Sequence, residues 1–205
     1  MGKYCVDRER IERLCRLSGV NNSKKTVENF KAFLETYYKI RDDLKYLPKG
    51  FYSDEIWKEA PDLFKAMALK KSIPENKREA FLALLIRSGH FDDILTGVFE
   101  SIKSFSADGE NYYQILYMLY FDDEPHKNIE IEKKIGYSHT AYQEKKELAI
   151  TLFGLMFWKR FLDHWDNSTE EMYKIEKSIG RDGSLSDRKF AEENKDRGIV
   201  FTEYE

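Results

Sequence analysis

Residues 128–146 read NIEIEKKIGYSHTAYQEKK, and their pattern predicts two short helical runs that meet at Gly136. Asn128 is a suitable N-cap for the first run. Gly136 supplies the left-handed backbone geometry that ends a helix and allows a sharp turn. Ser138 is then placed to cap the second run. The segment therefore predicts two helices joined by a tight turn.

The second predicted helix has two chemically different sides. The small and apolar side holds Ala141, Leu148, Ala149 and Leu152. The polar side holds His139, Tyr142, Gln143 and Lys146. A helix that packs on small residues, points polar groups outward and is held at its start by a short turn can read the major groove of DNA.

Each outward residue type suits a particular contact. Gln143 matches an adenine edge, and His139 or Thr140 matches a base or a phosphate. Tyr142 suits a phosphate or a thymine methyl group, while Lys145 and Lys146 suit the phosphate backbone. The amides that follow Ser138 add partial positive charge. The predicted DNA-binding residues are Lys133, Lys134, Ser138, His139, Thr140, Tyr142, Gln143, Lys145 and Lys146.

Helical patterns continue on both sides of this segment. The chain of 205 residues has only four prolines and eleven glycines, and strand-like alternation is scarce. Thirty aromatic residues and a hydrophobic share of 41% are enough to fill a core. Apolar residues spaced three and four apart, as in TVENFKAFLETYYKIRDDLKYL, are typical of packing helices. These features predict an all-α protein.

The loop sequence SADGE suggests a boundary between two helical regions. We expect an N-terminal helical bundle over residues 1–106 and a helix-turn-helix domain over 107–165. Residues 166–205 are expected to form a short helix, opened by a capping box of Ser168 and Glu171, and a flexible tail.

The segment LFGLMFWKRFLDHW, residues 152–165, carries many large apolar groups, and Gly154 offers a place for a bend. Such a segment must be buried inside the protein or against another chain. A homodimer through this segment is one expectation, since dimers are also how such motifs read paired half-sites.

A longer segment, YYQILYMLYFDDEPHKNIEIEKKIGYSHTAYQEKKELAITLFGLMFW, resembles the C-terminal domain of RinA/ArpU-type phage transcriptional regulators, which is related to region 4 of sigma factors. The resemblance rests on YYQILYMLY, on IGYSHTAY and on KKELAI before an apolar stretch, and it covers less than a quarter of the chain. It implies DNA contact through Ser138, His139, Thr140, Tyr142, Gln143, Lys145 and Lys146. It also implies a regulator of phage or mobile-element genes that docks on promoter DNA and recruits or blocks RNA polymerase.

The charge distribution keeps a second reading open. The formal net charge is -3, yet residues 1–50 hold twelve Lys and Arg against seven Asp and Glu. Residues 110–160 hold seven against eight, which disfavours an unaided DNA-binding surface. Glu132 also lies four residues before the turn glycine, where a small residue is usual. The alternative is a protein-binding factor, such as an antirepressor, an anti-defence protein or a polymerase adaptor, that keeps the helix-turn-helix shape.

The sequence gives little sign of catalysis. It contains no GxxxxGK[ST], GxGxxG, HExxH, GxSxG or CxxC pattern, so we expect no enzyme activity, cofactor or bound metal. Two polar clusters, His90 with Asp92 and Asp93, and residues 122–126, are more typical of helix caps and solvated loops. Two cysteines without a partner pattern, a charged N-terminus and the lack of a long apolar run favour a cytoplasmic protein without membrane contact.

Overall fold

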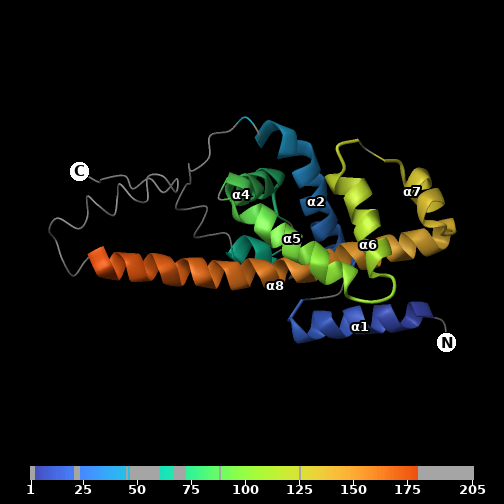
Figure 1. Ribbon diagram of the computed structural model, residues 1–205, viewed down its shortest axis with the longest axis horizontal. Coiled ribbons are helices and arrows are strands. Elements are labelled where there is room, and N and C mark those ends of the chain that lie inside the picture. Colours follow the sequence, from blue (N-terminus) through green and yellow to red (C-terminus); the bar gives the residue numbers. More distant parts are fainter. Residues whose placement is uncertain are drawn as a thin grey trace.

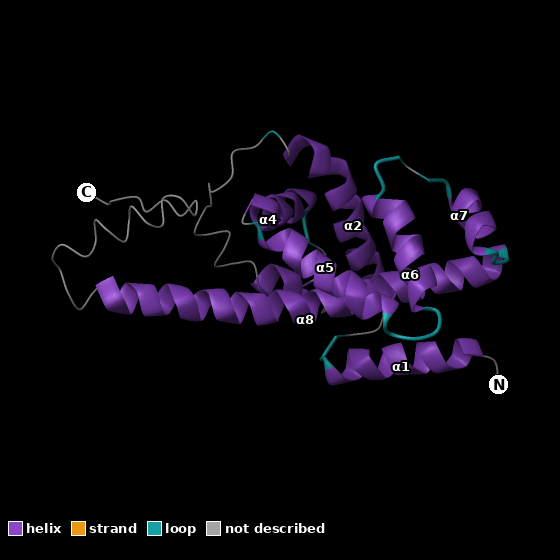
Figure 2. Cartoon of the chain, viewed as in Figure 1, coloured by secondary structure: helices purple, strands orange, loops and turns teal. Residues whose placement is uncertain are grey.

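The computed structural model describes residues 3–20, 24–44, 46, 61–66, 73–87, 89–124 and 126–179. Its elements are α1 (Lys3–Leu17), α2 (Lys24–Leu44), a short helix at 61–66, α4 (Glu75–Arg87), α5 (His90–Lys103), α6 (Gly109–Leu116), the π-helical segment η1 (Tyr117–Phe121), α7 (Asn128–Ile135) and α8 (His139–Ile179). Within these ranges no residue forms a strand (Figure 2). The all-α prediction is confirmed.

Helix α8 is the axis around which the other helices pack (Figure 1). It contains 41 residues, which corresponds to about 62 Å at 1.5 Å per residue. Helix α1 lies along one side of it, and α2, α4, α5 and α6 lie on the other. Helix α7 lies beside the N-terminal end of α8, so the segment predicted to bind DNA is at one end of the molecule.

The core is rich in aromatic rings that come from distant parts of the chain. The ring of Phe64 stacks on those of Phe157 and Trp158 with centroids 5.3 Å apart, and Phe33 meets Phe157 edge to face at 5.3 Å. Such pairs contribute about 0.5–1.5 kcal/mol beyond the area they bury. Helices on both sides of residue 106 therefore share one core.

This core accounts for the apolar segment 152–165. Leu152, Phe153, Leu155, Phe157 and Phe161 are buried against other helices of the same chain. Their burial needs no second copy, so the surface that suggested a dimer is already covered within the chain. The side chain of residue 165 and those after it lie outside the described ones.

Two predictions about this part of the chain are wrong: the bend at Gly154 and the separate short helix after residue 165. A Cβ atom at Gly154 would lie 2.2 Å from the Phe30 ring, so the glycine permits close packing in a helix that continues through it. No glycine or proline occurs between Gly154 and Gly180, and the helix runs unbroken to Ile179. Ser168 and Glu171 lie inside α8, so the predicted separate short helix is part of α8. The predicted flexible tail from 180 onward lies outside the described residues.

No helix in the described ranges has both the length and the apolar character needed to cross a bilayer.

Cys15 is a free thiol on the buried side of α1, and burial raises its pKa to about 11. A thiol with that pKa stays protonated near neutral pH and is a poor nucleophile.

Candidate nucleic-acid interface

The turn between α7 and α8 has the geometry expected from its sequence. Gly136 adopts a left-handed conformation with φ 78°, and its N–H bonds to the carbonyl of Glu132 at 2.9 Å. Ser138 directly precedes α8, and its Oγ accepts the N–H of Ala141 at 3.4 Å. The predicted turn at Gly136 and the predicted cap at Ser138 are confirmed.

Asn128 has a different role from the predicted one. It is the first residue of α7, and the backbone N–H of Lys127 before it is bound by the Glu130 carboxylate at 2.9 Å. The Asn128 Oδ1 instead accepts the hydroxyl of Tyr142 at 2.8 Å and the ammonium of Lys146 at 3.1 Å. Asn128 therefore joins α7 to α8, a role that its cap-like sequence position did not indicate.

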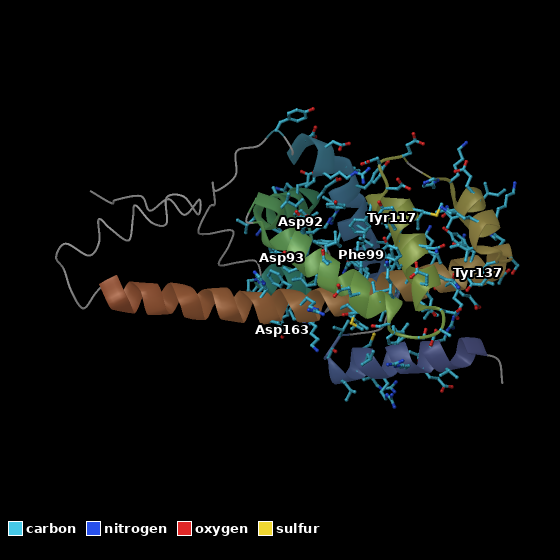
Figure 3. All side chains as sticks on the ribbon, viewed as in Figure 1. Asp92, Asp93, Phe99, Tyr117, Tyr137 and Asp163 are labelled. Atoms are coloured by element: carbon cyan, nitrogen blue, oxygen red, sulfur yellow. The ribbon has the colours of Figure 1, made fainter. Side chains whose placement is uncertain are left out.

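Five of the predicted DNA-binding residues are exposed: Lys133, Lys134, Ser138, His139 and Thr140. Gln143, one turn further along α8, is half-exposed. These six side chains belong to the end of α7 and the first turns of α8, and Figure 3 shows the nearby Tyr137 where the two helices meet. The structure thus brings the six residues to one end of the molecule.

Glu132 lies against this surface. Its side chain is 13% exposed, and its Oε1 is 2.8 Å from Nδ1 of His139. The carboxylate therefore leans across the turn to the first residue of α8. This contact places a negative group beside a residue predicted to contact DNA.

The prediction that Tyr142 and Lys145 face solvent is wrong. Tyr142 is fully buried and Lys145 is 1% exposed. Lys146 is half-buried, and its pKa is lowered by burial and then by the charge of Lys31 on α2. Ala149 and Leu152 are buried as predicted, but Tyr142 and Lys145 share the buried side with them, while Ala141 and Leu148 are only half-buried.

Lys145 is part of a polar network inside the protein. Its ammonium donates to Asp108 Oδ2 at 2.5 Å and to the Tyr112 hydroxyl at 3.3 Å. Tyr112 in turn donates to Asp7 Oδ2 on α1 at 2.8 Å, and Ser106 donates to the same oxygen at 2.8 Å. The network therefore joins α1, the loop before α6, α6 and α8.

The same network reaches the turn before α8. The Tyr137 hydroxyl donates to Asp108 Oδ1 at 3.2 Å and accepts the Asn111 amide at 2.8 Å. Burial alone would raise the pKa of Asp108, but the hydrogen bond and charge of Lys145 outweigh it and lower the pKa. Burial and the neighbouring Asp7 carboxylate raise the pKa of Tyr112, so Tyr112 keeps its proton.

The exposed charges from the loop before α7 to the first turns of α8 are mainly negative. The cations are Lys127, Lys133 and Lys134, and the exposed carboxylates of the same region are Asp123, Glu124, Glu130, Glu144 and Glu147. A surface with this balance of charges gains little affinity for DNA from the neutralisation of phosphates. Any affinity for DNA here must come from specific contacts or from cations elsewhere on the molecule.

No family model matches the sequence, and neither a curated protein nor a solved structure shows significant similarity to the chain.

In the cluster of residues 122–126, His126 lies between two carboxylates, since its Nδ1 is also 3.9 Å from Glu130 Oε2. Nε2 of His126 is 2.8 Å from Asp122 Oδ2, and this contact is the main reason that the pKa of Asp122 is lowered. Asp92 and Asp93 are exposed on α5, while the side chain of His90 lies outside the described ones (Figure 3). Among the side chains that the structure describes, no group of three or more His, Cys, Asp or Glu is arranged to hold a metal ion.

Proposed function

We propose that the chain is a DNA-binding transcription regulator in which α6, α7 and the start of α8 act as a helix-turn-helix. The observation that carries this proposal is the exposed start of α8, with Ser138 just before it and His139 and Thr140 as its first residues, which follow the left-handed turn at Gly136. In such motifs the N-terminal residues of the second helix contact base edges in the major groove. The resemblance to phage regulators supports the same role and suggests promoter DNA, with RNA polymerase recruited or blocked there.

In this proposal different exposed residues contact the bases and the phosphates. Gln143 and His139 contact base edges, and Ser138 and Thr140 contact phosphate or bases at the helix start. Lys133 and Lys134, exposed at the end of α7, contact the flanking phosphates. Tyr142 and Lys145 act indirectly, because their internal hydrogen bonds fix how α8 is held.

Sequence selection with the purified protein, followed by titration of labelled duplexes, tests the proposal. Gln143→Ala should reduce discrimination at one base position by about 1–3 kcal/mol, because it removes a bidentate base contact. Lys133→Ala with Lys134→Ala should weaken all duplexes alike and reduce the salt slope of binding by about 2. Lys159→Ala, an exposed lysine on a distant part of α8, is the control. Unchanged preference in Gln143→Ala would count against base reading by α8.

A second candidate function is favoured by the carboxylates around the turn. Glu130, Glu144 and Glu147 are exposed, and Glu132 lies beside His139. A surface of this kind is complementary to a basic patch on another protein. If no duplex is bound at low ionic strength, with native or random sequence, this protein-binding function replaces the first.

A further inference from the structure

Helix α1 has an inner side that belongs to the core and an outer side that does not. Ile11 and Cys15 are fully buried, and Asp7 is held by Tyr112 and Ser106. The outer side carries the arginines, since Arg8, Arg10, Arg13 and Arg16 are all exposed. The carboxylates that offset these positive charges are the exposed Glu9 and the half-buried Glu12.

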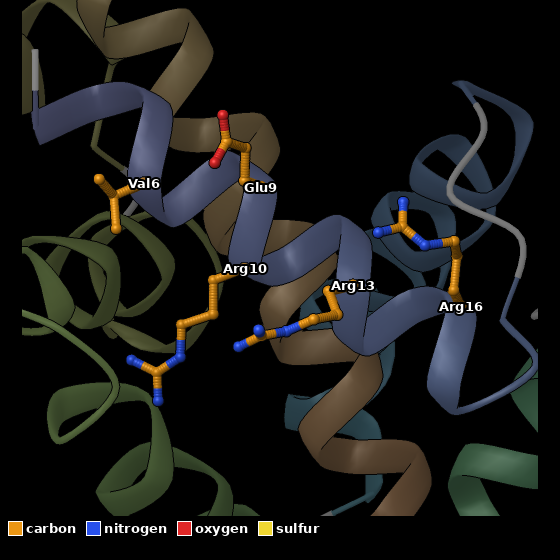
Figure 4. A pocket seen from close by; sticks show the side chains of 5 residues that line it. All are labelled: Val6, Glu9, Arg10, Arg13 and Arg16. Atoms are coloured by element: carbon orange, nitrogen blue, oxygen red, sulfur yellow. The ribbon is translucent and has the colours of Figure 1, made fainter. Parts of the chain in front are cut away.

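Three of these arginines border a depression on the surface. It is open, has a volume of about 480 Å³ and is lined by Val6, Glu9, Arg10, Arg13 and Arg16 (Figure 4). Arg10 is held in place, because its guanidinium lies 4.2 Å above the centre of the Phe105 ring and donates to the Phe105 carbonyl. In Figure 4 the guanidinium groups of Arg10 and Arg13 extend toward the same side of α1.

Arg13 and Arg16 keep their charge available for a partner. In the part of the chain that the structure describes, no carboxylate forms an ion pair with either guanidinium. Side chains three residues apart on a helix have Cβ atoms about 5–6 Å apart, so Arg13 lies next to both Arg10 and Arg16. In Figure 4 the Arg16 side chain extends in a different direction from those of Arg10 and Arg13. Planar guanidinium groups bind phosphate oxygens in a bidentate manner.

The surface does not fit an apolar partner. Val6 and Leu17 are 63% and 77% exposed, but they are eleven residues apart, about 16 Å along the helix. They therefore form no continuous apolar patch. A polyanion is the partner whose chemistry matches exposed arginines around an open depression.

We propose that the outer face of α1, formed by Arg10, Arg13 and Arg16, is a second nucleic-acid surface that binds the phosphate backbone without regard to sequence. This inference rests on the proposed function, because it adds cations to the exposed Lys133 and Lys134 at the end of α7. The Asp7–Tyr112–Lys145 network fixes α1 to α8. The network thus holds α1 against the helix whose first residues are proposed to read bases.

Titration of a labelled random-sequence duplex at increasing salt tests the inference on the full chain. The variants are Arg13→Gln with Arg16→Gln, and the matched control is Lys65→Gln with Lys159→Gln, which removes two exposed charges elsewhere. The arginine pair should reduce the slope of log K against log salt by about 1.8 and weaken all duplexes alike. The lysine pair should leave the slope unchanged. Arg13→Lys with Arg16→Lys should keep the slope, and thermal melts of each variant check its folding.

The outcomes separate this inference from the proposed function. If the arginine pair binds like the lysine control while Gln143→Ala changes sequence preference, the α1 surface is refuted and the proposed function stands. If the arginine pair loses affinity while Gln143→Ala changes no preference, the α1 surface stands and base reading by α8 is refuted. Absence of binding to any duplex by the unaltered protein refutes both.

Discussion

Lys145 and Asp108, 37 residues apart in the chain, form an ion pair at 2.5 Å with the lysine side chain only 1% exposed. The pair joins the first turns of α8 to the loop before α6, and Tyr112 extends it to α1. A buried ammonium is tolerated only when it is paired and hydrogen-bonded. Two acceptors surround Lys145, and this arrangement explains why a lysine is found on the core side of α8.

Replacing Lys145 by methionine should destabilise the protein strongly. The substitution leaves the half-enclosed Asp108 carboxylate without its cation, and removing one partner of a buried pair costs about 3–5 kcal/mol. Because the Asp108 side chain is 25% exposed, we expect a value near the lower end of that range. Urea unfolding followed by circular dichroism measures the loss. Lys134→Met, at an exposed position, should change stability by less than about 0.5 kcal/mol.

Because of Asp108, the free energy of unfolding should decrease as the pH falls into the acid range. Its pKa in the folded protein is lowered, so its contribution is present above the unfolded value of about 3.9 and is lost as the pH falls through the folded value. The difference in free energy of unfolding between the parent protein and Asp108→Asn should be constant from about pH 7 to pH 5 and shrink below about pH 4. A difference that stays constant to lower pH would contradict the lowered pKa.

Gly154→Ala should destabilise the core. The new methyl group would lie 2.2–2.5 Å from three atoms of the Phe30 ring, and overpacking of this kind costs about 1–3 kcal/mol. Gly97→Ala in α5 is the matched control, because its methyl group would meet, at 2.9 Å, only the far end of the long, exposed Arg160 side chain. The control should be neutral or slightly stabilising, since alanine favours helix over glycine. Thermal unfolding of both variants distinguishes the two cases.

Glu132→Gln should strengthen DNA binding if α7 and α8 approach a duplex. The carboxylate lies 2.8 Å from His139 and would repel nearby phosphates. We expect tighter binding of every duplex at low salt and a smaller effect at high salt, because screening reduces the repulsion. Fluorescence anisotropy measures the change, and Glu100→Gln, an exposed carboxylate on α5, is the control. Equal behaviour of the two variants would show that Glu132 does not face DNA.

The sequence predicted the helices and the turn well because those features are local. Gly19, Gly89 and Gly136 each adopt positive φ at the end of a helix or before the next one, where glycine is expected. The periodic apolar residues of α2 correctly indicated that Phe30, Phe33 and Leu34 are core residues. Local signals of this kind need no knowledge of which helices pack together.

The orientation of α8 was not predictable in the same way. Lysine and tyrosine were assigned to the polar side by residue type, yet Tyr142, Lys145, Ala149 and Leu152 form one buried stripe. That stripe has helical spacing and is visible in the sequence. What the sequence does not show is that Asp108 and Asn128, both distant along the chain, supply the acceptors that make burial of Lys145 and Tyr142 favourable.

The network around Lys145 also constrains how this chain can change over generations. Lys145 is hydrogen-bonded to Asp108 and to Tyr112, and Tyr112 is hydrogen-bonded to Asp7. A substitution at one of these four positions therefore affects the partners of the others. In descendants of a common ancestor we expect these positions to mutate together, with an apolar residue at 145 accompanied by loss of the acid at 108. Arg13 and Arg16, on the outer side of α1, form no contact with these four residues and should vary independently of them.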